Sequence, residues 1–409
     1  MKKSSGESPR ELGRYRSKRD PVQTTEPFSA ERKGSERSTR TGRFVCHLHR
    51  ARREHYDLRI ECSGTLLSFA VPRGPSLRPL DKRLAVHTEN HPLEYLDFEA
   101  VIPEGNYGAG SMIAWDTGRI RYLETSAEEG LARGDLKFEL SGFKLRGTYA
   151  LVQTGRRKQM SEGEGAEWLL IKKKDAYADA ESDVLTQDRS VLSGLTADEN
   201  LRKDEVTQAL AALVAQAPAQ QLAARELSPM RCALEGAGLT DPERLYELKL
   251  DGVRIVGEKR GAQAALRYRN GRSATASYAE IARALSLLPA HEALLDGEIV
   301  TFDAEGKPSF ERLAPRIHAQ RPLDIEQARA AVPVVYLVFD LLSLDGRDLT
   351  GWPLVERKRL LAELVRGRGL LRVLDHIEDD GSALYDFCRR ERLEGVVAKR
   401  KQSPYRAGA

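Results

Sequence analysis

Short segments in which apolar and polar residues alternate run through the N-terminal half of the chain, and glycines such as Gly105, Gly118 and Gly142 interrupt them. Alternation with a period of two is typical of strands that bury one face, and glycine is common in the turns between strands. The pattern therefore predicts an antiparallel β-barrel or sandwich over residues 41 to 178.

The C-terminal half, residues 227 to 409, mixes two patterns. Tyr278 to Leu288 and Leu354 to Val365 show helical periodicity, while Val334 to Leu342 is a nearly continuous apolar run that predicts a buried strand. This mixture indicates an α+β domain. Residues 179 to 226 lack strand patterns and predict a linker with one helix, around Asp204 to Gln216.

Composition adds limits to this picture. The 409 residues are long enough for several domains, and the net charge of +4 is too small for DNA affinity without local basic patches. Residues 1 to 40 are rich in Arg, Lys, Ser and Gly, which predicts a basic, partly disordered arm along a phosphate backbone or, alternatively, a solvated tail. The chain has four scattered cysteines and no leader, membrane span or lipidation motif, so we expect a cytoplasmic protein and no membrane partner.

Five of the eight histidines lie between His47 and His91. In an extended backbone His55, Asp57 and Arg59 share one face, and the same rule would align Arg83, Glu89 and His91. With His49 nearby, this predicts a metal site of nitrogen and oxygen ligands beside a phosphate clamp; manganese, zinc and iron all fit such a site. The alternative is a set of hydrogen-bonded core or surface histidines.

The run Glu247 to Arg254 predicts a second centre. Its alternating residues meet at Asp251-Gly252, a common hairpin turn, and that register would place Lys249 opposite Arg254. Two facing cations would attract a phosphate, and a lysine in this setting can act as a nucleophile. The alternative is an exposed hairpin with surface charges.

Further motifs follow this run in a fixed order: Tyr268–Gly271, Leu295–Val300, Val338–Leu342 and Glu394–Arg400. Together with Lys-x-Asp-Gly-x-Arg at Lys249–Arg254, they resemble the covalent nucleotidyltransferases, the class of ATP-dependent DNA ligases, RNA ligases and capping enzymes. The resemblance implies that Lys249 attacks the α-phosphate of ATP, that Glu394 helps to hold Mg²⁺, and that the nucleotide contacts Glu247, Arg254, Arg269, Glu298, Phe339 and Lys399. Phe339 would stack on the purine, although core packing is an alternative for a residue in a buried strand.

The N-terminal half resembles the 3′-phosphoesterase domain of bacterial DNA ligase D, through His55–Arg59, Phe69–Ser76, Asp81–His87 and Ile102–Gly110. The resemblance implies that His49, His55 and Asp57 bind Mn²⁺ and that Arg59, Arg83 and His91 engage the 3′-terminal phosphate. It implies supporting roles for Arg19, Asp20, Glu26, Arg73, Glu89 and Tyr95. His47 stands where the family commonly has glutamine, and it could add a competing metal ligand. Arg73 stands where lysine is usual.

These resemblances imply an enzyme of bacterial non-homologous end joining at the nucleoid. Its substrates would be double-stranded DNA ends and nicks that carry a 3′-ribonucleotide or 3′-phosphate. The family's Trp-x-Lys-x-Lys element and OB-fold domain are not found before the sequence stops at Ala409. We therefore expect an adenylyltransferase domain that lacks its OB-fold and has impaired ligase activity. The alternative is a non-catalytic scaffold that binds DNA ends or the protein Ku.

Overall fold

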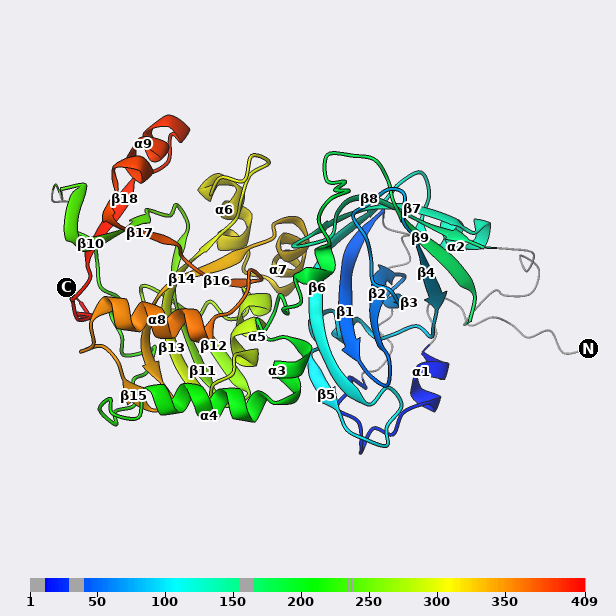
Figure 1. Cartoon of the computed structure of the whole chain (residues 1–409), viewed down its shortest axis with the longest axis horizontal. Coiled ribbons are helices and arrows are strands. Elements are labelled where there is room, and N and C mark those ends of the chain that lie inside the picture. Colours follow the sequence, from blue (N-terminus) through cyan, green and yellow to red (C-terminus); the bar gives the residue numbers. More distant parts are fainter. Residues whose placement is uncertain (1–11, 29–39, 155–164, 234–235, 237, 409) are drawn as a thin grey trace, which may run out of the picture. The chain divides into compact units, whose positions relative to one another are not determined.

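The computed structural model describes residues 12–28, 40–154, 165–233, 236 and 238–408. The chain forms two compact units (Figure 1). The barrel unit comprises Met1–Val191 and Leu195–Leu201, and the α+β unit comprises Leu192–Gly194 and Arg202–Ala409. The residues predicted to be a linker are divided between the two units, since Val184 is buried in the first and Leu210 in the second.

The barrel unit is built on one antiparallel sheet with the order β1-β2-β3-β4-β9-β8-β7-β6-β5, and a further pairing of β1 with β6 closes it. The predicted antiparallel barrel is confirmed. Its strands are β1 (Thr41–Arg50), β2 (Glu54–Cys62), β3 (Thr65–Val71), β4 (Lys82–His87), β5 (Ala100–Ile102), β6 (Gly110–Tyr122), β7 (Asp135–Gly142), β8 (Arg146–Gln153) and β9 (Glu167–Lys172). Its helical elements are α1 (Gly13–Ser17), η1 (Leu93–Asp97), α2 (Ala127–Arg133), η2 (Val184–Thr186) and α3 (Ala197–Leu201).

Strand alternation separates the apolar core of the barrel from the polar site. In β2, Leu58 and Ile60 belong to the core, together with Phe69 of β3 and Trp115 of β6. The residues between them in β2 point to the other face, as the period of a strand requires. Tyr15 of α1 is buried there against Tyr95 of η1, at a ring-centroid distance of 5.9 Å. This part of the predicted arm is therefore packed, while residues 1–11 and 29–39 lie outside the described residues.

The α+β unit contains two sheets. The six-stranded sheet has the path β12-β11-β13-β14-β15, with β16 paired to β14, and the three-stranded sheet has the order β17-β10-β18. The strands are β10 (Thr240–Leu248), β11 (Val253–Arg260), β12 (Gln263–Tyr268), β13 (Glu292–Val300), β14 (Val335–Leu344), β15 (Arg347–Asp348), β16 (Leu371–Val373), β17 (His376–Asp380) and β18 (Val396–Arg400). The helices are α4 (Lys203–Leu213), α5 (Ala279–Leu287), α6 (Phe310–His318), α7 (Pro322–Ala331), α8 (Leu354–Leu364) and α9 (Ser382–Glu391).

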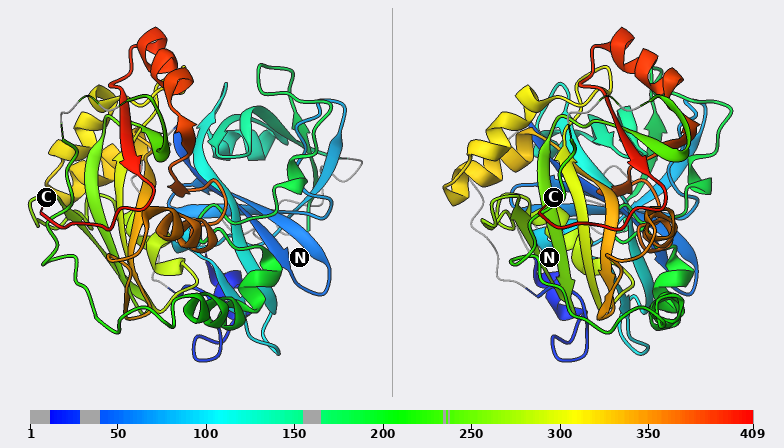
Figure 2. Two further views of the ribbon diagram at one scale, coloured as in Figure 1. Left: turned by 60° about the vertical axis from the view of Figure 1, so that its left-hand side comes forward. Right: turned by 90° about the vertical axis from the view of Figure 1, so that its left-hand side faces the viewer.

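Several local predictions for this unit are confirmed. The apolar run became β14, which is buried along its whole length, and the two periodic segments became α5 and α8. The helix predicted around Asp204 is α4. Figure 2 shows α6 and α7 lying side by side next to the six-stranded sheet. In the described residues we find no helix whose length and apolar character would suit a membrane crossing.

The hairpin predicted at Asp251-Gly252 is wrong. β10 pairs with β17 and β18, whereas β11 pairs with β12 and β13, so the two arms belong to different sheets. A tight hairpin turn of the favoured type needs positive φ at both central residues, and neither Asp251 nor Gly252 has a positive φ. Glycine is needed here for another reason, because a Cβ on Gly252 would lie 2.4 Å from the carbonyl oxygen of Ile299.

Candidate functional site

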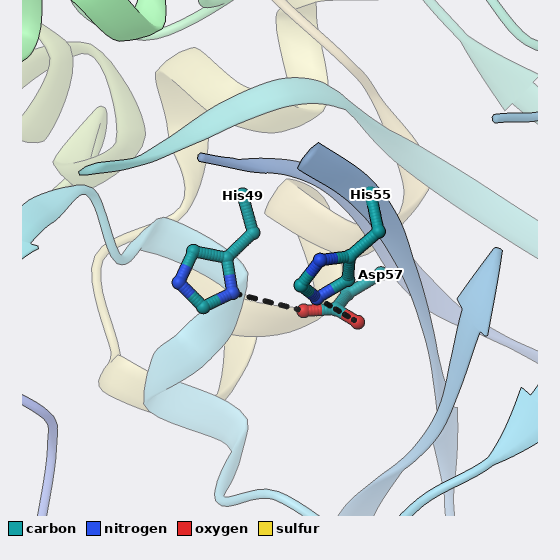
Figure 3. Close-up of side chains that lie close together, drawn as sticks. All are labelled: His49, His55 and Asp57. Carbon is teal, nitrogen blue, oxygen red and sulfur yellow. Dashed lines mark ion pairs between the residues drawn. The ribbon is translucent and has the colours of Figure 1, made fainter. Parts of the chain in front are cut away.

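Three side chains of two neighbouring strands converge on one point of the barrel unit (Figure 3). In the register of β1 and β2, His49 lies opposite His55, and His47 lies opposite Asp57. One ligand atom from each of His49, His55 and Asp57 lies within 4.8 Å of the others. His49 Nδ1 is 3.9 Å from Asp57 Oδ2, and His55 Nε2 is 3.6 Å from Asp57 Oδ1.

In His49 and His55, the ring nitrogen that points away from Asp57 makes a hydrogen bond. These bonds determine which nitrogen of each imidazole can bind a metal. His49 Nε2 donates to the carbonyl oxygen of Gly108 at 2.8 Å, and His55 Nδ1 donates to that of Arg53 at 2.9 Å. A carbonyl oxygen only accepts, so each of these nitrogens carries the proton. The lone pairs are therefore on His49 Nδ1 and His55 Nε2, the atoms that face Asp57. Two imidazole nitrogens and a carboxylate oxygen suit a divalent ion such as manganese, zinc or iron.

His47 has no lone pair to offer this site. Its Nε2 donates to the carbonyl oxygen of Phe98 at 3.1 Å, and its Nδ1 accepts from Arg59 Nη1 at 2.8 Å. Burial, followed by the charge of Arg59, lowers the pKa of His47 well below its ordinary value, so the ring is neutral. The expectation that His47 competes for the metal is therefore wrong, because both ring nitrogens are already used.

Arg59 places a positive charge beside the three ligands. The residue is 3% exposed, and Nη2 donates to Asp57 Oδ2 at 3.1 Å and lies 3.5 Å from His91 Nε2. The guanidinium carbon also lies 5.0 Å from the centre of the Tyr95 ring. Burial would raise the pKa of Asp57, but the charge of Arg59 and the neighbouring imidazoles together outweigh it and keep that pKa below its ordinary value. A buried guanidinium next to an imidazole can bind a phosphate oxygen.

The N-terminal segment supports this arrangement. Arg19 pairs with Glu26 at 2.9 Å and with Glu89 at 3.0 Å, and the hydroxyl of Tyr95 donates to Glu26. The carbonyl oxygen of Glu89 accepts the Nδ1–H of His91 at 2.8 Å, which leaves His91 Nε2 directed at Arg59. Four of the six residues expected to support the site therefore form one network.

The remaining expected residues lie elsewhere. Asp20 accepts from the backbone of Val22 at 2.9 Å in a local turn, and Arg73 is exposed. The alignment of Arg83 with His91 is wrong, because β4 ends at His87 and the alternation cannot continue beyond it. Arg83 pairs in register with Leu170 of the core and forms an ion pair with Asp81 at 2.9 Å.

The second predicted centre lies in the α+β unit. Lys249 forms an ion pair with Glu394, and both side chains are about two-fifths exposed, at 39% and 41%. The backbone N–H of Lys249 donates to the carbonyl oxygen of Gly395 at 2.9 Å. Lys249 therefore lies against the segment that leads into β18, and its charge meets a carboxylate rather than Arg254.

Arg254 also has a carboxylate partner. Its Nε and Nη2 donate to the two oxygens of Asp296 at 2.6 and 2.7 Å, and the hydroxyl of Tyr405 donates to the same carboxylate at 2.6 Å. The ring of Phe339 lies 4.4 Å from the guanidinium carbon of Arg254 and 4.4 Å from Lys399 Nζ. Phe339 is 7% exposed, so its ring is buried beside these two cations, and its contact with a purine stays a prediction.

Glu298 and Arg269 lie at the same end of the six-stranded sheet. Glu298 is paired in register with Arg254, and Tyr268 with Ile255, which places Arg269 just beyond the end of β12 in an exposed turn. Glu298 Oε1 accepts from the backbone of Gly252 at 2.9 Å. Burial raises the pKa of Glu298 to about 7.

Glu247 is enclosed rather than open to a nucleotide. It is 1% exposed and forms ion pairs with Lys358 of α8 and Lys399 of β18. Burial would raise its pKa, but the two ammonium groups hold it below the ordinary value. Lys358 is a partner that sequence reasoning missed. A signal existed, because positions 354, 358 and 361 share one helix face, and a lysine among leucines there indicates a buried partner.

Comparisons with known proteins agree with both halves of this description. Residues 47–153 match the family model of the DNA ligase D 3′-phosphoesterase domain, and residues 230–409 match that of the ATP dependent DNA ligase domain. The chain is 38% identical over 411 aligned positions to the multifunctional non-homologous end joining protein LigD of Pseudomonas aeruginosa, covering 98% of this chain and 46% of the relative. For the protein of the same name from Mycolicibacterium smegmatis, identity is 33% over 404 positions, with 97% and 44% covered.

Among solved structures, the ligase domain of LigD from M. tuberculosis is 34% identical, with a TM-score of 0.39, and the match covers 46% of this chain and 58% of that one. The chain spans about half the length of the curated relatives it matches.

Proposed function

Because this chain belongs to the DNA ligase D proteins, with a 3′-phosphoesterase domain followed by an ATP-dependent ligase domain, we propose that it processes and joins DNA ends. The related proteins are named for non-homologous end joining, and we extend that process to this chain. A DNA substrate would place the protein at the bacterial nucleoid.

The barrel unit would remove a 3′-terminal ribonucleoside or phosphate from a DNA strand. The observation that carries this proposal is the convergence of His49, His55 and Asp57, with their lone pairs facing one point beside buried Arg59. These three residues would hold Mn²⁺, which would supply a Lewis acid next to the phosphate. Arg59 and His91 would bind the phosphate oxygens and orient the terminal ester. Removal of a ribonucleoside leaves a 3′-phosphate on the strand, and hydrolysis of that phosphate leaves the 3′-hydroxyl that strand joining requires.

The direct experiment uses a primer–template with a 5′-labelled primer that ends in one ribonucleotide. The purified chain with Mn²⁺ should shorten the primer, and a chelator should prevent it. His49→Ala should lose this activity because one metal ligand is missing, while His291→Ala, an exposed histidine of the other unit, serves as the matched control. If wild type and His49→Ala trim the primer equally, the proposed metal site is wrong.

The α+β unit would form a covalent adenylyl intermediate. We propose that the amine of Lys249 attacks the α-phosphate of ATP, forming a nitrogen–phosphorus bond as pyrophosphate leaves, with Mg²⁺ held by Glu394. Glu298, Arg269, Phe339 and Lys399 are proposed to contact the nucleotide. Support comes from the exposed position of Lys249 next to Glu394, at the segment preceding β18.

ATP labelled at the α-phosphate tests this second activity. A labelled adduct should form on the wild type and be absent from Lys249→Arg, since a guanidinium keeps the positive charge but does not act as a nucleophile. Lys401→Arg, whose lysine pairs with Glu378 at 2.8 Å, is the control. An adduct that persists in Lys249→Arg would assign the chemistry to another residue.

A scaffold that binds DNA ends or Ku without catalysis is the second candidate. It would be favoured if trimming and adenylylation both fail while DNA binding persists and weakens steeply with salt. Retention of the chain by immobilised Ku in the same assay would support Ku as a partner.

A further inference from the structure

An exposed tyrosine lies next to the proposed metal site and has no part in the function described so far. Tyr107 is 52% exposed, although tyrosine is large and partly apolar. Its neighbour Gly108 is the residue whose carbonyl oxygen accepts the hydrogen bond from His49, at 2.8 Å. Adjacent Cα atoms are ~3.8 Å apart, so the tyrosine ring starts one residue from the backbone group that orients a metal ligand.

The loop that carries Tyr107 has a defined conformation. The backbone N–H of Asn106 donates to Pro103 at 3.3 Å, and that of Ala109 donates to Asn106 at 3.2 Å. At Gly110 the loop touches the end of β1, since a Cβ there would lie 2.2 Å from the carbonyl oxygen of Arg50. The backbone that carries Tyr107 is therefore held in place beside the strand that carries His49.

Two cations join Tyr107 to the phosphate-binding side of the same site. Lys18 Nζ lies 5.0 Å from the centre of the ring, and the guanidinium carbon of Arg19 lies 5.4 Å from it. Both cations also pair with Glu89, at 3.2 and 3.0 Å, and the backbone carbonyl of Glu89 orients His91. Tyr107 is therefore next in sequence to Gly108, which contacts the proposed metal ligand His49. A chain of contacts through Lys18, Arg19 and Glu89 also connects its ring with His91.

We propose that Tyr107 forms a stacking subsite for a nucleobase at the 3′ end of the strand. Aromatic side chains bind bases of any sequence because every base has a π-face, and neighbouring cations attract the backbone phosphates. Tyr107 supplies the exposed ring, and Lys18, whose side chain is 27% exposed, supplies a cation beside it; the side chain of Arg19 is buried and already paired with Glu26 and Glu89. The inference rests on the proposed 3′-end processing and adds the ligand class, a nucleobase, that is recognised beside the phosphate.

The test is steady-state kinetics with primers ending in a ribonucleotide. Tyr107→Leu should raise KM about 10-fold and leave kcat unchanged, in line with the loss of one base–aromatic stack. Tyr107→Phe keeps the ring and should behave as the wild type. Tyr177→Leu is the matched control, because Tyr177 is 46% exposed and its ring lies 4.9 Å from the guanidinium of Arg146, outside the site. Equal KM values for Tyr107→Leu and wild type would overturn the proposal.

A primer whose last nucleoside lacks its base separates stacking from a general effect on the loop. The wild type should bind this abasic end as weakly as Tyr107→Leu binds the complete end, and the substitution should add nothing further. An equal rise in KM on complete and abasic ends would overturn the subsite. Primers ending in a 3′-phosphate show which base is stacked. If Tyr107→Leu has a higher KM than the wild type on these primers, the ring stacks on the base that stays on the strand. If the KM is unchanged, the ring stacks on the base of the departing nucleoside, and either result supports the subsite.

The same variants distinguish this inference from the proposed function. If the wild type trims no 3′ end, the proposed hydrolysis fails, and equilibrium binding of the same labelled primers then tests the subsite directly. Binding that is about 10-fold weaker in Tyr107→Leu, but only for ends with a base, would still support stacking. Binding that is unchanged would overturn it.

Discussion

The two candidate sites are assembled in different ways. In the barrel unit, His49, His55 and Asp57 come from two adjacent strands, and the buried charge of Arg59 is already paired. In the α+β unit, Lys249 and Glu394 come from segments 145 positions apart in the numbering (394 − 249), and the two side chains of their ion pair are about two-fifths exposed. The first site is preorganised by strand register. The second needs its ion pair to open before Lys249 can act as a nucleophile.

The two sites should therefore respond differently to substitutions. In the barrel unit, the positions of the site side chains depend on a few neighbouring residues of paired strands. Single substitutions there should mainly change metal binding or the rate of the reaction. Groups collected from several elements depend on buried ion pairs such as Glu247 with Lys358 and Lys399, so substitutions there should act on stability as well.

The largest effect is expected at Asp57. Asp57→Asn should lower kcat for 3′-end trimming at least about 100-fold, because a metal ion contributes several kcal/mol to such reactions. Mn²⁺ should also stop raising the unfolding temperature of the barrel unit, since binding to the folded state is lost. Asp188→Asn, at an exposed position of the same unit, is the control. Full activity in Asp57→Asn would show that the preorganised triad is not the metal site.

Next comes Glu247. Glu247→Gln leaves Lys358, whose side chain is 3% exposed, without a counter-charge. Breaking a buried ion pair costs about 3–5 kcal/mol, which corresponds to a drop of roughly 10 °C in unfolding temperature for a unit of this size. Calorimetry of the whole chain should show that only the transition of the α+β unit moves. With exposed Glu243→Gln as the control, an unchanged transition would contradict the stabilising role of this pair.

A smaller effect concerns pH. Burial raises the pKa of Glu298 from 4.5 to about 7, so the folded α+β unit binds this proton more tightly than the unfolded chain. Its contribution to stability is therefore fully present below pH 4.5 and is lost as the pH rises to about 7, a change of about 2–3 kcal/mol. Denaturant unfolding at pH 4.5 and 8 measures it. Glu298→Gln should remove this part of the pH dependence; parallel curves for both proteins would refute the assignment.

The smallest effect is expected at His47. A glutamine can accept from Arg59 and donate to Phe98 as the imidazole does, so His47→Gln should change the free energy of unfolding by less than about 1 kcal/mol. His47→Leu leaves both partners unsatisfied and should cost about 1–3 kcal/mol. Urea unfolding measures the free energy of unfolding of both variants. If His47→Gln and His47→Leu lose similar amounts of stability, packing rather than hydrogen bonding accounts for the contribution of His47.

Features that depend on neighbours along the chain could be predicted from the amino-acid sequence. The placement of Asp57 and Arg59 on one face of β2 follows from a period of two, and α5 and α8 follow from helical periodicity. The same period places His55 and Asp57 on one face of β2, while His49 was added to them by the resemblance to the 3′-phosphoesterase domain.

Contacts between residues far apart in the sequence could not be predicted and are set by how the whole unit packs. Asp251-Gly252 connects two sheets instead of closing a hairpin, so Lys249 meets Glu394 and Arg254 meets Asp296. Which strands pair depends on packing over the whole unit, so a local sequence pattern does not predict the pairing. The end of β4 at His87 likewise separated His91 from Arg83, because the alternation of a strand does not continue beyond its pairing with β3 and β9.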